Sequence, residues 1–446
     1  MAIASAFNEE NAGGESMRST KKTKQNEEMI AAYIGLDWAD KEHEVTMLVV
    51  ETGLVESCKL KQESEALAEW VQSLLRRFPG RKVAIAVEQR KGALINALMI
   101  YDFLILYPVN PKTLARFREA FNTSGAKSDP ADSELLLDLI RLHRDKLRAW
   151  VPEDADTRLL QMLVQDRREL VDDVTVLTNR LKSTLKQYFP QALDWAGDLS
   201  SRQALDFLTR WPTLESIRKA GAVAVEKFYH CHSVRNKEKI EQRVKAIKEA
   251  RALTTDRAIL TASRMKALAI VRQLGALVKS IAEMEARIQE LFEKHPDHEV
   301  FSSFPCAKKV LGPRLLAAFG RDRSRYEAAL DLQSLSGIAP VTRSSGKSKT
   351  IHKRLACPKF LRQTFHEYAA QSIKKAGWAR VYYRAHRDKG VKHHAAVRAL
   401  AYKWIRIMFK CWQEQEPYNE AKYVASLKRR SSPLVPGLLP APNALV

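Results

Sequence analysis

The stretch Ala31-Ala-Tyr-Ile-Gly-Leu-Asp-Trp38 sets a carboxylate inside an otherwise apolar run. A second apolar run, Lys82-Val-Ala-Ile-Ala-Val-Glu88, ends in another carboxylate. Both runs have the length and composition of buried β-strands. A charge in or at the end of such a strand is costly unless something cationic satisfies it. Asp37 and Glu88 are therefore the first candidate functional residues.

The segments around these two runs predict an α/β region. Strands are expected at 33–38, 44–50 and 54–60, and then helices and strands alternate. The helices are expected at 64–78, 92–101, 112–121 and 130–144, and the further strands at 82–87 and 103–109. This order resembles that of the ribonuclease-H-like fold, in which the first strand carries a central acid, the fourth strand ends in one, and a late helix supplies the last.

Two more carboxylates stand at the start of the last of these helices, in Lys127-Ser-Asp-Pro-Ala-Asp132. Asp129 and Asp132 are three residues apart, so they share one helix face. Asp129 as N-cap and Asp132 at the third helical position would also form a capping box, and that alternative stays open. Together with Asp37 and Glu88, the pair points to Mg²⁺ and phosphodiester chemistry.

Charge predicts a polyanionic partner. The chain has 446 residues, a formal net charge of +22 and an isoelectric point near 9.7. Residues 341–410 hold 18 Lys and Arg residues against two acids, Glu367 and Asp388. Such a surplus favours nucleic acid as the partner. The aromatic residues between these cations could stack on bases or form the core of helices, and both remain open.

Other features exclude several classes of protein. Five cysteines without CxxC spacing indicate a reducing cytosol and no disulfide framework. No apolar run approaches a membrane span and no signal peptide opens the chain, so we expect a soluble, cytoplasmic protein.

The middle of the chain is expected to be helical, at 155–189 and 239–294, with a helical cap at about 195–235. Apolar residues recur at steps of three and four, which predicts an antiparallel coiled-coil hairpin or a dimer interface: Leu274, Leu277, Ile281, Met284, Ile288 and Leu291. A mainly α C-terminal region follows, with helices at 308–319, 326–334, 358–375 and 393–412 and a loop at 337–348. The predicted organisation is a disordered tail (1–28), an α/β domain (29–150), a coiled-coil domain (151–298), a C-terminal domain (299–415) and a tail (416–446).

The chain resembles the DEDD transposases of bacterial insertion sequences, the IS110 group that includes the Piv invertases, over about 30–412. Ile34-Gly-Leu-Asp37 and Val87-Glu88 match the first two acid motifs of that family. Lys127-Ser-Asp-Pro-Ala-Asp132 matches its Lys-Thr-Asp-x-x-Asp signature with Ser for Thr. Ser336-Gly-Ile-Ala-Pro340 with Ser344-Ser-Gly346 matches the element that carries its serine.

The resemblance implies a RuvC-like domain whose acids Asp37, Glu88, Asp129 and Asp132 bind Mg²⁺. It also implies a C-terminal transposase domain whose serine attacks DNA. The matched serine is Ser345, with Ser344 as the second choice. A non-coding guide RNA from the element and a dimer or tetramer on the bacterial nucleoid are implied as well. Basic residues flank the serine and could bind phosphates: Arg343, Lys347, Lys349, Lys353 and Arg354.

The chain also departs from the family pattern. Phe304-Pro-Cys-Ala-Lys308 lacks the glycines of the family's Pro-Gly-Ile-Gly turn, and the segment at about 195–260 has no assigned role. Two other functions remain possible. A RuvC-like nuclease or branched-DNA resolvase would act by hydrolysis without Ser345. A non-enzymatic nucleic-acid-binding coiled-coil protein would use the acids only as caps.

Overall fold

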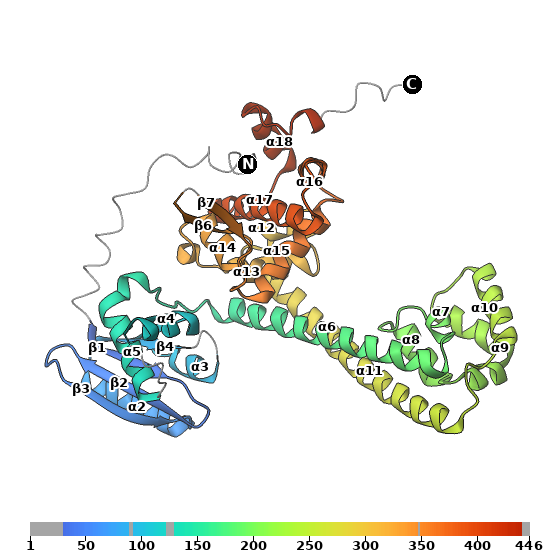
Figure 1. The fold of residues 1–446 in the computed structure, drawn as a ribbon, viewed down its shortest axis with the longest axis horizontal. Coiled ribbons are helices and arrows are strands. Elements are labelled where there is room, and N and C mark those ends of the chain that lie inside the picture. Colours follow the sequence, from blue (N-terminus) through green and yellow to red (C-terminus); the bar gives the residue numbers. More distant parts are fainter. Residues whose placement is uncertain (1–29, 89–91, 122–128, 347, 439–446) are drawn as a thin grey trace. The chain divides into compact units, whose positions relative to one another are not determined.

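The computed structural model describes residues 30–88, 92–121, 129–346 and 348–438, and of Phe121, Asp129 and Lys349 the backbone alone (Figure 1). The chain divides into two compact units, the first up to Pro152 and the second from Glu153. The predicted tail at 1–28 lies outside the described residues. The finer domain limits at 150/151 and 298/299 stay predictions. No helix among the described residues is both long and apolar enough to cross a membrane.

The first unit is built on a five-stranded sheet of order β3-β2-β1-β4-β5. Its strands are β1 (Ile30–Asp37), β2 (Glu42–Val49), β3 (Val55–Lys61), β4 (Lys82–Val87) and β5 (Leu104–Pro108). β1, β2 and β3 pair antiparallel, whereas β4 lies parallel to β1, and β5 parallel to β4. The mixed α/β class and the predicted order of strands and helices are confirmed.

Helices cover both faces of this sheet. Ala32, Ile34 and Leu36 of β1 pack in one core with α2 (Ser64–Arg77) and α3 (Ala93–Leu98). On the opposite face lie α4 (Pro111–Phe121) and α5 (Asp129–His143), whose apolar residues pack against Ala84 and Ala86. Small side chains on that face let a helix come close to the strands.

The second unit is organised around two long helices, α6 (Ala155–Tyr188) and α11 (Arg257–Lys294). Leu160 and Val164 near the start of α6 share a core with Ile288 near the end of α11, so the pair is antiparallel (Figure 1). The predicted helical hairpin is confirmed, and supercoiling stays a prediction. Leu274, Ile288 and Leu291 of the predicted seam are buried, whereas Leu277, Ile281 and Met284 between them are only partly buried.

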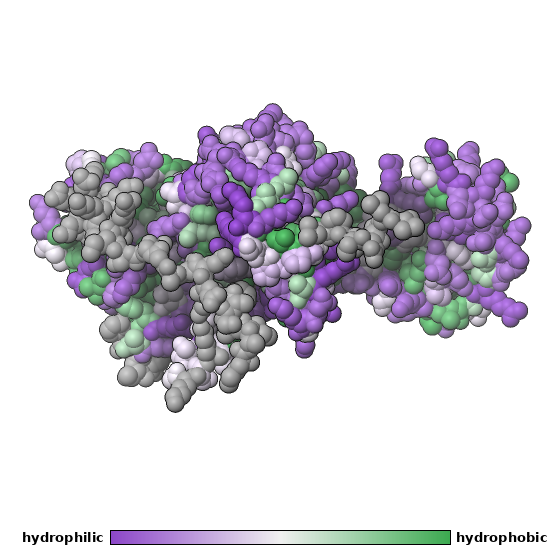
Figure 2. Space-filling model, turned by 90° about the horizontal axis from the view of Figure 1, so that it is seen from above, coloured by the Kyte–Doolittle hydropathy of each residue, from purple (hydrophilic) through white to green (hydrophobic). Residues whose placement is uncertain are grey.

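Four helices form a tip at one end of this pair: α7 (Ala192–Trp195), α8 (Arg202–Arg210), α9 (Leu214–Cys231) and α10 (Lys237–Glu249). The helix predicted over 239–294 is two helices, because α10 ends at Glu249 and the Asp256 carboxylate caps α11. Aromatic side chains, including Trp211 and Phe228, are buried in the tip core. Its visible surface is mostly hydrophilic (Figure 2).

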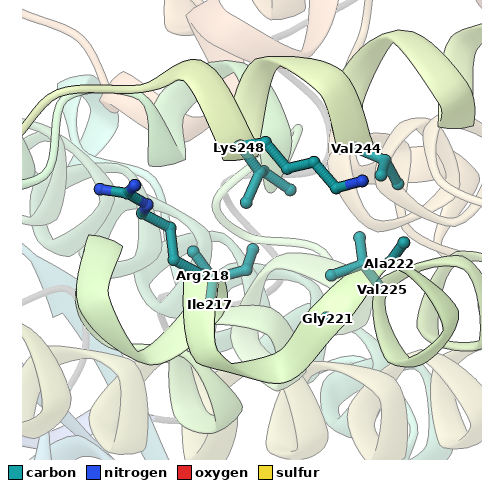
Figure 3. A pocket seen from close by; sticks show the side chains of 8 residues that line it. Ile217, Arg218, Gly221, Ala222, Val225, Val244 and Lys248 are labelled. Carbon is teal, nitrogen blue, oxygen red and sulfur yellow. The ribbon is translucent and has the colours of Figure 1, made fainter.

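A hollow of about 330 Å³ lies between α9 and α10 in the tip (Figure 3). Gly221 interrupts α9 with φ 74° and ψ 164°, which L side chains rarely adopt, and the kink contributes to this hollow. Ile217 and Val225 line it together with Arg218 and Lys248, so charge meets an otherwise apolar lining. No pattern in the sequence predicts this hollow.

The rest of the second unit is a mainly helical C-terminal region around one core. It contains α12 (His298–Ser302), α13 (Leu311–Phe319), α14 (Ala329–Leu335), α15 (Lys359–Ser372), α16 (Gly377–Asp388), α17 (His393–Glu414) and α18 (Glu420–Arg429). The predicted loop at 337–348 contains most of a hairpin of β6 (Val341–Ser345) and β7 (Ser348–His352). Its polar side chains concealed the strands.

The segment 416–438 also differs from its prediction as a tail. It includes α18, and Leu427 and Leu434 are buried in the core of the C-terminal region. The Lys428-Arg-Arg430 run and the following prolines concealed these few apolar contacts. Trp378 and Trp404 are fully buried as well, so these two aromatic residues serve the core rather than base stacking.

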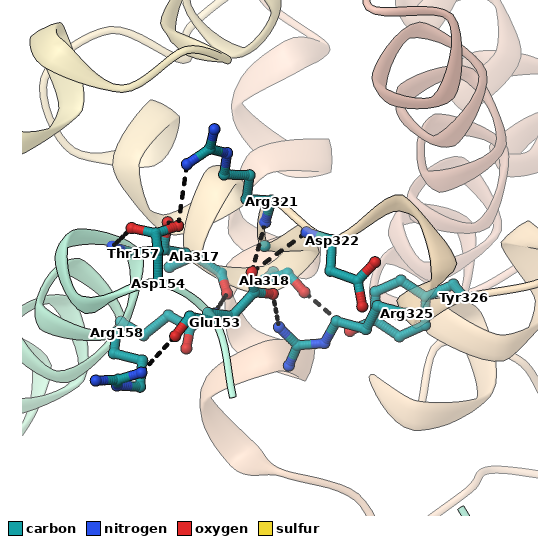
Figure 4. Close-up of polar contacts among 12 residues, drawn as sticks. Glu153, Asp154, Thr157, Arg158, Ala317, Ala318, Arg321, Asp322, Arg325 and Tyr326 are labelled. Atoms are coloured by element: carbon teal, nitrogen blue, oxygen red, sulfur yellow. Dashed lines mark hydrogen bonds and ion pairs between the residues drawn. The ribbon is translucent and has the colours of Figure 1, made fainter. Parts of the chain in front are cut away.

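Glu153 ties the start of α6 to the turn after α13 (Figure 4). Its carboxylate accepts hydrogen bonds from the backbone N–H groups of Arg321 and Asp322 at 3.0 and 3.2 Å. The Arg325 guanidinium donates to its other oxygen at 2.9 Å. A nearly buried carboxylate with three donors fixes this turn firmly.

Candidate functional site

Asp37 and Glu88 lie at the same edge of the first unit's sheet. Asp37 is the last residue of β1, and Glu88 directly follows β4. The two strands are parallel neighbours in which Leu36 pairs with Val87, so their carboxyl ends coincide. Ligand sites of open α/β sheets are found at this kind of edge.

Both acids also belong to the face that α5 covers. Side chains alternate along a strand. Ala84 and Ala86 of β4 pack with α5, so Glu88, two residues after Ala86, belongs to the same face. In β1, Tyr33 packs on that side. Asp37 lies four residues later, so its side chain belongs to the same face. Both half-buried carboxylates are thus directed to the side of α5.

Gly35 lets α5 lie close against β1, at the helix turn that directly follows the first one. A Cβ on Gly35 would lie 2.0 Å from the Ser133 carbonyl oxygen and 2.4 Å from the Leu137 nitrogen. The Ser133 hydroxyl also lies 2.7 Å from that of Thr46 on β2. Later turns of α5 pack toward Ile30, so the helix runs against β1 and begins near its carboxyl end.

Asp132, in the first turn of α5, is buried with 1% of its surface exposed. The Arg118 guanidinium from α4 donates to its Oδ1, through Nε at 2.9 Å and through Nη2. Its Oδ2 is buried and accepts no hydrogen bond from the described residues. A buried carboxylate oxygen without a donor suits a hard cation, whose ligands are oxygens. Asp132 therefore fits the implied magnesium ion.

The full metal set is not assembled among the described side chains. Within that part of the chain, no three His, Cys, Asp or Glu residues gather closely enough to hold an ion. Asp129 is the first residue of α5, and its side chain lies outside the described part. The choice between capping and metal binding for Asp129 thus stays open. Sequence reasoning missed Arg118, which lies 14 residues before Asp132 and has no motif around it.

Ser345 lies at the turn of the hairpin in the second unit. It ends β6, is exposed and pairs with Ser348, while Ser344 pairs with Lys349. Gly346 follows with φ 53°, so the backbone turns there in the left-handed region. An exposed serine at such a turn is accessible to a large substrate.

The predicted phosphate-binding residues are distributed along the same hairpin. Arg343 is exposed on β6 and pairs with Thr350, and Lys353 and Arg354 follow β7. Lys347 lies outside the described residues, as does the side chain of Lys349. The acids and Ser345 belong to different units.

Cys306 follows Pro305 at the position where the family's Pro-Gly-Ile-Gly turn has a glycine. Its φ is 66°, in the left-handed region that favours glycine. The backbone turn is thus present without the expected residue, which the sequence could not reveal.

Comparison with known proteins agrees with these features. Residues 34–190 match the DEDD transposase family of IS110, described as "Transposase", and residues 298–384 match the "Transposase IS116/IS110/IS902 family". The proposed mini-circle transposase for IS117 of Streptomyces coelicolor is 27% identical over 412 residues, covering 90% of this chain and 98% of that protein.

Two further relatives are insertion-element proteins. The IS900 42 kDa protein of Mycobacterium paratuberculosis is 25% identical over 88% of this chain and 98% of its own. The IS116 44.8 kDa protein of Streptomyces clavuligerus is 26% identical over 87% and 96%. Both family matches are to transposases, a class of DNA-recombining protein. The chain belongs to the IS110/IS116 family of insertion-element transposases.

Proposed function

We propose that this transposase cleaves and rejoins DNA strands with Mg²⁺ held by Asp37, Glu88, Asp129 and Asp132 of a RuvC-like unit. The observation that carries the proposal is the shared sheet edge: Asp37 and Glu88 end parallel neighbours on the face of α5, whose first turn holds Asp132. Bound there, the metal would stabilise charge on phosphoryl oxygens.

Ser345 is the proposed nucleophile. Its Oγ would form a bond to the phosphorus while the bond to the leaving deoxyribose oxygen breaks, and that oxygen takes a proton. The resulting phosphoserine ester keeps the bond energy, so the reverse attack by a strand end rejoins DNA without ATP. A serine hydroxyl needs activation, which an acidic metal site can supply. The two units must meet for this step, within one chain or between two.

The partners proposed are DNA, a guide RNA from the element, and further copies of the chain. The partly buried centre of the α6–α11 pair, with Val176 47% exposed, supports a dimer or tetramer formed there. The net charge of +22 supports nucleic-acid partners and a place on the bacterial nucleoid in the cytoplasm.

The decisive test compares Ser345→Ala with Asp37→Asn in recombination of a plasmid that carries the element's ends. Both are expected to lose activity, and neither should give the denaturant-resistant protein–DNA adduct that the wild type forms. Ser348→Ala, across the same hairpin, is the matched control.

The outcomes separate the alternatives. Loss in Asp37→Asn alone, with full activity in Ser345→Ala, would indicate hydrolysis or Ser344 as the nucleophile. Ser344→Ala decides between these two. Full activity in both variants would indicate a binding protein. Sequencing of RNA that co-purifies with the protein tests the guide.

A further inference from the structure

A basic pocket of about 340 Å³ lies in the second unit, beside the hairpin that carries Ser345. Its walls come from the first turns of α15 and α17 and from the segment after β7. Four cations line it, and we call them the pocket cations: Lys353, Lys359, Arg362 and Arg398. Only Lys353 was among the residues expected to bind phosphates.

The charge of this pocket is not neutralised from within. Among the described residues, no carboxylate forms an ion pair with a pocket cation. The nearest acid along α15, Glu367, is engaged with the Arg314 guanidinium, with Arg168 at 3.4 Å and with the Gln363 amide at 3.1 Å. Four positive side chains around one hollow repel one another, and an anion would remove that cost.

Two histidines complete the lining. The rings of His366 and His394 lie 5.4 Å apart between centroids. Burial, and then the nearby His394, Arg398 and His393, hold the pKa of His366 below its usual value, with Glu367 acting in the opposite direction. These surroundings make His366 harder to protonate than a free imidazole. An anion would favour its protonated form, so binding near neutral pH should take up protons.

The helical walls of the pocket are well packed, and its lining suits phosphate more than bases. α15 and α17 pack through a shared core that includes Phe365 and Leu400, and the Trp404 indole donates to the Ser372 hydroxyl at 2.8 Å. Among the residues that the structure describes, no Phe, Tyr or Trp lines the hollow. Lys and Arg without aromatic platforms contact the nucleic-acid backbone rather than unstacked bases.

The hairpin sets the distance from this pocket to Ser345. Ser345 pairs with Ser348, and Lys353 lies five residues further along the chain. At roughly 3.3 Å per residue, an extended segment places Lys353 about 17 Å from the turn, close to five steps of a B-form strand. We propose that the pocket binds backbone phosphates of a DNA strand that lies along the β6–β7 hairpin. This inference rests on the proposed function in taking DNA as the ligand.

The test measures binding of full-length protein to short fluorescent duplex DNA, single-stranded DNA and RNA of one sequence, as a function of salt. Arg362→Gln with Arg398→Gln removes two pocket cations. Lys374→Gln with Lys375→Gln removes two exposed cations beyond the end of α15 and is the charge-matched control. Lys353→Gln with Lys359→Gln changes exposed side chains and replaces the first pair if that pair does not fold.

The pocket variants should lower the slope of log affinity against log salt by about two with DNA, and the control pair by less than one. Titration calorimetry in two buffers of different ionisation enthalpy should show proton uptake that His366→Gln abolishes. Equal slope changes in both pairs, or a change with RNA alone, would overturn the inference. The proposed function is tested by a separate measurement and fails if Ser345→Ala still recombines DNA. That substitution removes no charge, so it should leave the salt slopes unchanged.

Discussion

Arg118→Met tests how the acidic edge of the first unit is held together. The substitution removes the guanidinium that donates twice to Asp132 and keeps most of the aliphatic stem. Asp132 is 1% exposed, and its Oδ2 already lacks a donor among the described residues. The variant therefore leaves a buried carboxylate without its cation.

The expected cost follows from this burial. Removing one partner of a buried ion pair costs about 3–5 kcal/mol. The Arg118 side chain is 18% exposed, so water reaches part of the pair and the lower value, about 3 kcal/mol, is expected. For a unit of this size that corresponds to a fall in Tm of roughly 12 °C.

Calorimetry of the full chain, with and without Mg²⁺, measures the effect on the first unit. If Asp132 helps to hold the metal, Mg²⁺ should stabilise Arg118→Met more than the wild type, because no guanidinium competes with the ion for the carboxylate. At a Mg²⁺ concentration of 100 times Kd, binding stabilises the folded unit by about 2.7 kcal/mol. Arg116→Met, an exposed arginine two residues away on α4, is the control and should change little. A loss below about 1 kcal/mol in Arg118→Met would refute the account of the pair. Equal effects of Mg²⁺ on both proteins would refute the link to the metal.

Three further predictions concern other contacts. Glu153→Ala should destabilise the second unit by about 3 kcal/mol, measured by chemical denaturation, because it removes a nearly buried carboxylate from three partly buried donors at 321, 322 and 325; a change under 1 kcal/mol would contradict this. Gly35→Ala should cost about 1–3 kcal/mol or more and weaken Mg²⁺-dependent stabilisation, since its methyl group meets the α5 backbone; wild-type stability would show that α5 can shift freely. Burial holds the pKa of His295 below 6.5, although Asp297 and Asp154 oppose it. The contribution of His295 to stability is therefore fully present above pH 6.5. It falls by up to about 1.4 kcal/mol per pH unit as the pH drops toward the folded-state pKa. His295→Gln should flatten the stability profile between pH 7.5 and 5.5, and an unchanged slope would exclude this histidine as its source.

The strand pattern around Asp37 and Glu88 was predictable because alternation and apolar length are local properties. The antiparallel helix pair was predictable for the same reason, from the spacing of Leu274, Ile288 and Leu291. These signals do not require knowledge of any distant partner.

The missed features all depend on partners that are distant in sequence or on weak local patterns. Arg118 gains its role only when α4 brings it to Asp132. The β6–β7 hairpin has polar strands, and its ladder is set by the turn at Gly346 rather than by apolar alternation. The basic pocket requires α15 and α17 to pack side by side, which places Arg362 beside Arg398.

The long helix pair has a mechanical consequence. α6 has 34 residues and so spans about 50 Å, with separate apolar cores at its two ends. Each end can unfold or be altered without disrupting the other, because the middle of the helix pair buries few apolar side chains. The tip could therefore be exchanged between relatives as a unit. Removing whole heptads from both long helices would shorten the distance between the two cores.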